Sequence, residues 1–558
     1  MLLATTIDYN DNAAVYPGPE EYYPLEKYEE DLKTLAENGI GKVYLRVNCS
    51  GYSNHPSKVV PVFGSDRSTS CWGTPHYARR LAESIKRYDC CEETIRIAHK
   101  YGMEAWAWES LYDDAGICWN ISKIPPEWME IYKRTGGWCG IDPFYLDNMD
   151  ALAARDPFRI PSPEKTVSAH RQVREKGIGR LVFINHPEWT GILQAPKITK
   201  DNLQIYISDD NQSFRLYDKE FSFLADQTED GRNRIVLSAL DIHSPYLKLL
   251  CTDHEKAPDY TMVLRKPEGQ GELYDTEGAP IQSGWAVNQG FIESTPVDFR
   301  CVRGNAAWDC ADCYLACAAG PADLTPYLYG FAEFNVPKAM EHKVARFEEL
   351  THYGFDGFQF NTRSHSAVNF PEQYGFNPEV LEKFEKRHGY KYTGSQEDIE
   401  RVFQIRGEAV AEFFKRCKAL TGGRPLFMSA PMPLKYKGHP AYNTSFGPMP
   451  WLYEKFFADG SIDGVIMIGK NFENGVDYSD YFTPEITGGR KITIGIFREM
   501  FGRPAGYDLA ADLEELRKSG LDEVELYESA MLNGNPQCFP FLRGDAEPGA
   551  KMEWTYHI

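Results

Sequence analysis

Short apolar runs alternate with amphipathic segments of helical period along both ends of the chain. Eight of these runs have the length and residue types of strands, and helical patterns follow most of them. We expect strands at residues 4–9, 42–48, 103–109, 357–363, 426–430, 464–469, 491–497 and 523–529. Such a succession predicts the α/β class and a (β/α)8 TIM barrel. A nucleotide-binding doubly wound sheet would need G-x-G-x-x-G after the first strand, and IDYNDNAAVYPGP does not contain it.

The helical period is interrupted between about residues 165 and 318. Runs such as RLVFI, LQIYISDD and YLKLLCT alternate with period two and are separated by Asn, Asp, Gly and Pro. This pattern predicts an antiparallel β-sandwich inserted after the third barrel strand. We therefore expect a first barrel part at 1–165, the insert at 166–318 and a second barrel part at 319–558. The loops after barrel strands share one face, so the insert should border the barrel mouth.

Charge and composition exclude several classes of partner. The chain has 60 basic and 81 acidic residues, a net charge of −21, which argues against nucleic acid. No run of about 18 apolar residues predicts a membrane span. The start MLLATTIDYND lacks the basic and long apolar regions of a signal peptide. A cytoplasmic location and a removed leader both stay open, as does assembly into homo-oligomers.

The 13 cysteines have no spacing typical of a disulfide framework. Cys310, Cys313 and Cys317 are close enough in sequence to bind zinc or iron, but no fourth ligand is evident. There is also no H-E-x-x-H motif. We expect free thiols, no metal site and no cofactor.

Candidate site residues lie where the predicted barrel strands end, because TIM-barrel active sites are built at that face. Strand alternation places Arg46, Asn48 and Glu499 inside the barrel, and we expect at most one of Trp106 and Trp108 there. Three glutamates are the candidate catalytic residues, with Glu109 as the acid and Glu528 or Glu499 as nucleophile or base. Asp8, Asp113 and Glu525 are the next candidates. The candidate substrate-binding residues are Asp8, Arg46, Asn48, Trp106, Trp108, Asn361, Arg363, His365 and Lys470.

This combination of residue types suits the cleavage of a glycosidic bond. One carboxylic acid protonates the leaving oxygen, and a second carboxylate acts as nucleophile or base. Aromatic faces stack on sugars, whereas amide, guanidinium and imidazole groups bind hydroxyls. The cationic residues also suggest an anionic sugar, although they can instead neutralise nearby carboxylates; they are Arg46, Arg363, Lys470 and Arg498.

Several motifs resemble a known family. WESLYDD after the third strand, HYGFDGFQFNTR at the fourth and GLDEVELYES at the eighth resemble glycoside-hydrolase-like barrels described as family 10-like hypothetical glycosidases. Relatives often carry an acid at the end of the fourth strand, where this chain has Asn361. The segment LQIYISDDNQSFRLYD resembles the strand-turn-strand of a discoidin-like or galactose-binding module.

The resemblance and the residues together predict a glycoside hydrolase acting on an oligo- or polysaccharide, with carbohydrate as the partner. Asn361 and the insert leave open a second function, a carbohydrate-binding barrel without catalysis. A third hypothesis is a Schiff-base lyase, because Lys470 ends the sixth strand and a desolvated lysine is a nucleophile.

Overall fold

The computed structural model describes most of the barrel and parts of the insert. The described residues are 1–49, 51–65, 75–117, 138–158, 171–185, 199–201, 203–209, 215–229, 231, 233–251, 269–281, 285–287, 298–302, 314–319, 328–362, 374–431, 453–468, 482–500, 508–546, 550 and 552.

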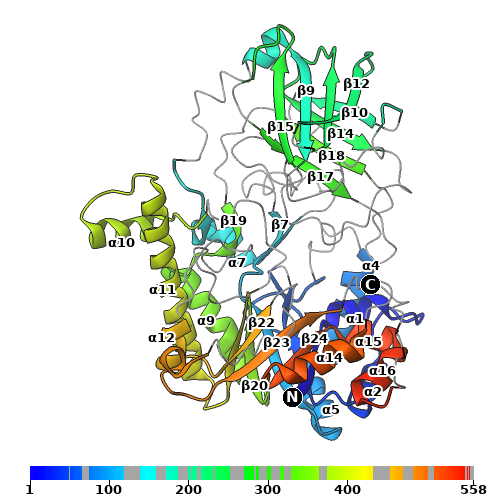
Figure 1. The fold of residues 1–558 in the computed structure, drawn as a ribbon, viewed down its shortest axis with the longest axis vertical. Coiled ribbons are helices and arrows are strands. Elements are labelled where there is room, and N and C mark those ends of the chain that lie inside the picture. Colours follow the sequence, from blue (N-terminus) through cyan, green and yellow to red (C-terminus); the bar gives the residue numbers. More distant parts are fainter. Residues whose placement is uncertain are drawn as a thin grey trace.

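Eight parallel strands close into a barrel, which confirms the predicted fold class (Figure 1). The last strand pairs with the first, with Leu2 opposite Glu523, so the sheet has no free edge. In barrel order the strands are β1 (Leu2–Ile7), β2 (Lys42–Arg46), β5 (Glu104–Ser110), β20 (Gly357–Asn361), β21 (Leu426–Pro431), β22 (Gly464–Ile468), β23 (Thr493–Glu499) and β24 (Glu523–Tyr527).

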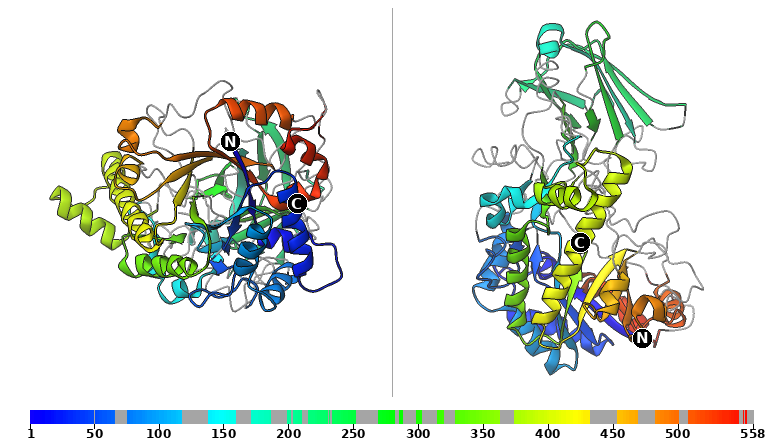
Figure 2. Two further views of the ribbon diagram at one scale, coloured as in Figure 1. Left: turned by 90° about the horizontal axis from the view of Figure 1, so that it is seen from below. Right: turned by 90° about the vertical axis from the view of Figure 1, so that its left-hand side faces the viewer.

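Helices cover the outside of the barrel, as the helical period predicts (Figure 2, left). Apolar strand residues such as Val43 and Leu45 belong to one large buried cluster with the inner faces of these helices. The predicted helices are α2 (Leu25–Glu37), α5 (Cys90–Lys100), α9 (Pro337–Thr351), α10 (Pro378–His388), α11 (Gln396–Leu420), α12 (Tyr453–Ala458) and α14 (Leu509–Lys518). Further helices are α1 (Tyr9–Val15), α4 (Pro75–Ile85), α7 (Pro143–Asp147), α13 (Pro484–Thr487), α15 (Ser529–Gly534) and α16 (Phe539–Arg543).

The insert consists of two five-stranded antiparallel sheets, as period-two alternation predicts. One sheet has the order β11-β10-β14-β18-β17 and the other β12-β13-β9-β15-β16. The strands are β9 (Ile178–Asn185), β10 (Leu203–Ser208), β11 (Arg215–Leu216), β12 (Ser222–Gln227), β13 (Asn233–Ser238), β14 (Tyr246–Cys251), β15 (Gly269–Asp275), β16 (Trp285–Val287), β17 (Asp298–Val302) and β18 (Tyr314–Ala319). The domain boundaries at residues 166 and 318 stay predictions.

The chain enters and leaves the insert side by side. β8 (Leu152–Ala154) pairs antiparallel with β19 (Leu328–Ala332), so the two crossing segments form a small sheet of their own. Two more short pairs, β3 (Asn48–Cys49) with β4 (Tyr52–Ser53) and β6 (Ala115–Ile117) with β7 (Trp138–Ile141), follow β2 and β5. Figures 1 and 2 place the insert beyond the end of the barrel at which the strands leave for their helices.

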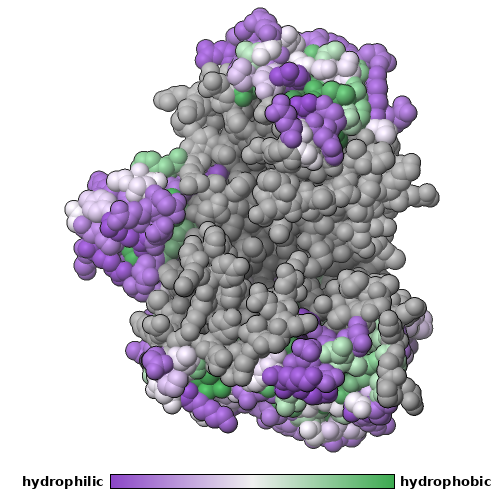
Figure 3. All heavy atoms as spheres, in the orientation of Figure 1, coloured by the Kyte–Doolittle hydropathy of each residue, from purple (hydrophilic) through white to green (hydrophobic). Residues whose placement is uncertain are grey.

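On the face shown in Figure 3, hydrophilic residues dominate the described surface over α10, whereas the described part of the insert shows hydrophilic and hydrophobic residues side by side. Within the described part of the chain, no helix combines the length and apolar character that crossing a bilayer requires.

Helix α11 begins with a hydroxyl cap. The side chain of Ser395 accepts a hydrogen bond from the backbone N–H of Asp398 at 3.2 Å. We expect Ser395→Ala to lower the free energy of unfolding by about 1 kcal/mol, because an orphan helix N–H loses its partner. Thr34→Ala is the control, since the Thr34 hydroxyl donates to Glu30 within α2 and caps nothing. Equal losses in urea unfolding of both variants would contradict the cap assignment.

Candidate active site

Arg46 lies at the centre of the polar residues at the barrel mouth. It ends β2, is 3% exposed, and its guanidinium forms ion pairs with Asp8 and with Asp113, the latter at 2.8 Å. Its Nε donates to the carbonyl of Asn48 at 3.0 Å, and its guanidinium carbon lies 5.4 Å from the ring centre of Trp108. Arg46 is therefore inside the barrel as predicted, where it neutralises carboxylates.

Asp8 leaves the strand and caps the next helix. It follows β1, and its Oδ1 accepts from the backbone N–H of Asn10 at the start of α1. One turn on, Asp11 lies in the first turn of α1. Because β24 pairs with β1, the residue after β24, Glu528, reaches the same corner. Oxygen atoms of Asp8, Asp11 and Glu528 all lie within 4.8 Å of one another.

Glu528 is the most deeply buried member of this acidic corner. Its side chain is fully buried, and neither carboxyl oxygen accepts a hydrogen bond from a donor among the described residues. Burial raises the pKa of Glu528 well above its usual range, the carboxylates of Asp11 and Asp8 raise it further, and Arg46 opposes them. Three acidic side chains therefore meet at a corner where Glu528 favours its protonated form.

Aromatic rings fill the barrel interior below this corner. Tyr44, Trp106, Trp108, Phe427 and Phe497 belong to one lumen cluster, and Tyr527 packs against it. The expectation that at most one of Trp106 and Trp108 faces inward is wrong, because residues two apart in a strand share a face. Trp108 is the one that touches the mouth, through its contact with Arg46.

Glu525 lies within the lumen, two residues before Tyr527. Its carboxyl accepts from the Thr6 hydroxyl at 2.5 Å and from the Gln359 amide at 2.9 Å, and the side chain is fully buried. Burial raises the pKa of Glu525 to about 7, despite these two donors. Its inward direction agrees with strand alternation.

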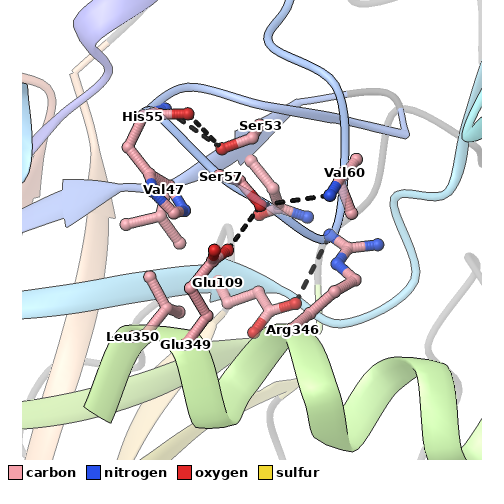
Figure 4. Close-up of a pocket in the computed structure, with 10 residues that line it drawn as sticks. Val47, Ser53, His55, Ser57, Val60, Glu109, Arg346, Glu349 and Leu350 are labelled. Carbon is pink, nitrogen blue, oxygen red and sulfur yellow. Dashed lines mark hydrogen bonds and ion pairs between the residues drawn. The ribbon is translucent and has the colours of Figure 1, made fainter. Parts of the chain in front are cut away.

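Glu109 lies on the other side of the barrel wall, which corrects its expected position at the mouth. Its register partner in β20 is Phe360, whose ring packs on Phe347 of α9. The Glu109 carboxylate faces Arg346 of the same helix at 3.4 Å (Figure 4). Next to Trp108 in the strand, Glu109 must point outward when Trp108 points inward. We therefore do not propose Glu109 as a catalytic residue.

A small pocket lies beside Glu109 between α9 and the loop after β4 (Figure 4). His55 and Glu109 line it, and the Nδ1 of His55 and the Oε2 of Glu109 have no partner among the described residues. Burial and the nearby Arg346 lower the pKa of His55 to about 3. The carboxylate of Glu349 lines another side of the pocket and accepts a hydrogen bond from the backbone N–H of Lys58 at 2.6 Å.

A buried ion-pair network behind β5 supports the loop that carries Asp113. Lys343 of α9 is fully buried and contacts Asp114 at 2.5 Å and the carbonyl of Leu111 at 2.7 Å. Arg346 pairs with the same carboxylate at 3.0 Å. Asp113 and Asp114 thus point to opposite sides, one toward Arg46 in the mouth and the other toward α9.

The remaining predicted residues fall into two groups. Asn48 exchanges hydrogen bonds with the backbone of Ser110 at 2.7 and 2.9 Å, so its amide joins the ends of β2 and β5. Asn361 is buried at the end of β20. Outside the described residues lie Arg363, His365, Lys470, the side chain of Glu499, and Cys310 and Cys313 of the considered metal motif.

Asp11 is the functional candidate that the sequence analysis missed. Its signal was the spacing Asp8-x-x-Asp11 at a helix start, where acidic residues are favoured. Only the closure of the barrel brings Glu528 beside it.

Comparisons with known proteins give no family for this chain. No family model matches the chain, and no curated protein matches it. The chain is similar to the catalytic domain of β-amylase from Paenibacillus polymyxa (10% identity, 98% of this chain and 99% of that chain, TM-score 0.37). It is similar to TcOYE with pHBA (10% identity, 99% of this chain and 90% of that chain, TM-score 0.33). It is also similar to β-mannanase from the blue mussel Mytilus edulis (10% identity, 40% of this chain and 64% of that chain, TM-score 0.23). These likenesses concern the fold alone, and the resemblance of the insert to discoidin-like modules finds no support in them.

Proposed function

We propose that the chain is a glycoside hydrolase whose reaction takes place where β1 and β24 end. The observation that carries the proposal is the pair of carboxyl groups of Asp11 and Glu528, whose oxygen atoms lie within 4.8 Å at a barrel mouth. Tyr527 interacts electrostatically with both carboxyl groups, and the ring of Trp108 contacts Arg46 of the same mouth. Carboxyl pairs beside aromatic faces are the equipment of glycosidases.

The spacing of the pair favours one stereochemical course. Retaining enzymes hold their two carboxyl groups about 5–5.5 Å apart, and inverting enzymes about 6.5–9.5 Å apart. The oxygens of Asp11 and Glu528, within 4.8 Å of each other, are too close for the water of an inverting enzyme. The proposal is therefore retention, in which one group protonates the leaving oxygen and the other attacks the anomeric carbon. Water then releases the sugar from the second group. Glu499 stays a further candidate from the sequence.

Arg46 does not support an anionic sugar as the substrate. Its two terminal nitrogens already pair with the carboxylates of Asp8 and Asp113. The described part of the mouth therefore presents no net positive charge to an anionic sugar. Neutral sugars are therefore the first substrates to test.

The test is hydrolysis of a panel of neutral aryl glycosides and oligosaccharides. On any member that is cleaved, we expect Glu528→Gln to lower kcat at least about a hundredfold with little change in KM, because the shape stays and a reacting carboxyl is lost. The matched control is Glu525→Gln. Glu525 is also a buried glutamate of β24, but it lies inside the lumen below the mouth, so its variant should keep the wild-type kcat. Unchanged turnover in Glu528→Gln, or no cleavage of any glycoside, would refute the proposal.

A second candidate function is carbohydrate binding without hydrolysis. It is favoured by Asn361, an amide at the end of β20 where resembling barrels often carry an acid. Saturable binding of a sugar in calorimetry, together with no cleavage of that sugar, would select this function over the first.

A further inference from the structure

We propose that Asp8, Asp11 and Glu528 form a binding site for one hard divalent cation such as Mg²⁺, Mn²⁺ or Ca²⁺. This inference goes beyond the proposed function and departs from the sequence-based expectation that the chain holds no metal. It rests on the position, burial and partners of the three carboxyl groups.

The geometry of the three side chains suits a shared ion. Magnesium and calcium bind carboxylate oxygens at about 2.0–2.6 Å. Two ligands on opposite sides of such an ion are then roughly 4–5 Å apart, by the same bond lengths. One oxygen from each of Asp8, Asp11 and Glu528 lies within 4.8 Å of the other two. A single ion between them would therefore reach all three without movement of the strands.

The burial of Glu528 is an independent reason to expect a ligand. Its side chain has no exposed surface, and neither of its oxygens meets a hydrogen-bond donor within the described parts of the chain. A carboxylate removed from water without a donor or counter-charge costs several kcal/mol (roughly 2–7 for a polar group, more when charged). One oxygen of Glu528 lies within 4.8 Å of an oxygen of Asp8 and of an oxygen of Asp11, so its nearest polar neighbours there are other carboxyl groups.

The local charge balance points the same way. Arg46 pairs with Asp8 and Asp113, and its guanidinium donates to a backbone carbonyl with its remaining edge. Among the described residues, no basic side chain forms an ion pair with Glu528, and neither of its oxygens has a hydrogen-bond donor there. Asn10, which lies between the two aspartates in sequence and is 1% exposed, also has a side-chain oxygen without a partner among the described residues.

A second group of ligand-type residues, Asp89, Cys90 and Cys91, is a useful contrast. Burial raises the pKa of the Cys91 thiol, and the Cys90 thiol donates to the carbonyl of Asn54 at 3.0 Å. Asp89 caps α5 through the backbone N–H of Cys91. These residues have structural partners, and thiols favour soft metals, so hard cations should distinguish the two groups.

The experiment is titration of the full chain with Mn²⁺ in the absence of sugar, by calorimetry and by the loss of the free-ion electron paramagnetic resonance signal. We expect one ion per chain, and we expect Glu528→Gln and Asp11→Asn each to weaken its binding at least tenfold. Asp150→Asn, at an exposed carboxylate that pairs with Lys338, should bind Mn²⁺ like the wild type. Asp11 is only partly buried, so its variant should fold even if the Glu528 variant does not.

Absence of Mn²⁺ binding at millimolar concentration would overturn the inference, as would binding that both variants retain. Because no sugar is present, this result does not depend on glycoside hydrolysis. If the proposed function also holds, Mn²⁺ at saturation should slow hydrolysis by the wild type, since the ion and the reacting sugar need the same Glu528 carboxylate. Ion binding with no glycosidase activity would refute that function alone.

Discussion

Replacing Arg46 with methionine is expected to lower the free energy of unfolding by about 3–5 kcal/mol. The side chain is 3% exposed, and the carboxylates of Asp8 and Asp113 that it bridges are equally buried. Removing one partner of a buried ion pair leaves uncompensated charge in a medium that solvates it poorly. Methionine keeps much of the apolar contact with Trp108, so the loss reports mainly on charge.

Equilibrium urea unfolding of the variant and the wild type measures this loss. The matched control combines Arg46→Met with Asp8→Asn and Asp113→Asn, which removes the charges that the arginine neutralises. We expect the triple variant to recover a large part of the lost stability, because the penalty comes from the unpaired acids. A loss below about 1 kcal/mol in Arg46→Met would show that the pairs behave like solvent-exposed ones.

The barrel and its insert could be predicted because each depends on local periodicity. A helical period marks the barrel, and a period of two marks the insert. Each end of the eight expected barrel strands lies within two residues of the observed end. β1 shows why ends are difficult: the expected range 4–9 becomes Leu2–Ile7, because Asp8 turns away to cap α1. A capping side chain ends a strand as effectively as a glycine does.

The errors within β5 came from applying strand alternation incompletely. Residues two apart share a face, so Trp106 and Trp108 together predict an inward Trp pair and an outward Glu109. The outward side is then completed by α9, where Lys343 and Arg346 lie on the barrel-facing side of the helix among apolar residues. Lys343 and Arg346 stand among the apolar residues of the buried side of α9. Basic residues in such a position indicate that acidic residues are buried opposite them.

The acidic corner could not be predicted from any local pattern. Asp11 and Glu528 are 517 positions apart, and they meet because β24 closes the barrel onto β1. Sequence places each residue after its strand, but the direction of a loop side chain depends on contacts that form only in the closed barrel.

Replacing Glu525 with glutamine is expected to remove a pH dependence of stability worth about 3 kcal/mol. Glu525 has a pKa of about 7 in the folded barrel, above the value near 4.3 of an unfolded chain. The folded state therefore binds the proton more tightly, so the stabilising contribution is complete below the unfolded pKa. It is lost as the pH rises through about 7, where folding must bury a carboxylate.

Glutamine should fit the site because the neighbouring amide can turn. The Thr6 hydroxyl and the Gln359 amide now donate to Glu525, and the Gln359 Oε1 has no partner among the described residues. A rotated Gln359 can accept from the new amide. Other groups that influence this position, Glu523 and Lys42, are unchanged in the variant.

The measurement is the free energy of unfolding of both proteins at pH 4.5 and at pH 8.5. The difference between variant and wild type should grow by about 3 kcal/mol in favour of the variant from the lower to the higher pH, which follows from the two pKa values. Glu523→Gln is the contrasting control, because Glu523 binds Lys42 at 2.5 Å and its loss leaves a buried cation. Glu523→Gln should therefore lower the free energy of unfolding at pH 8.5. If Glu525→Gln also lowers it at pH 8.5, the barrel interior stabilises Glu525 as a carboxylate and the prediction is wrong.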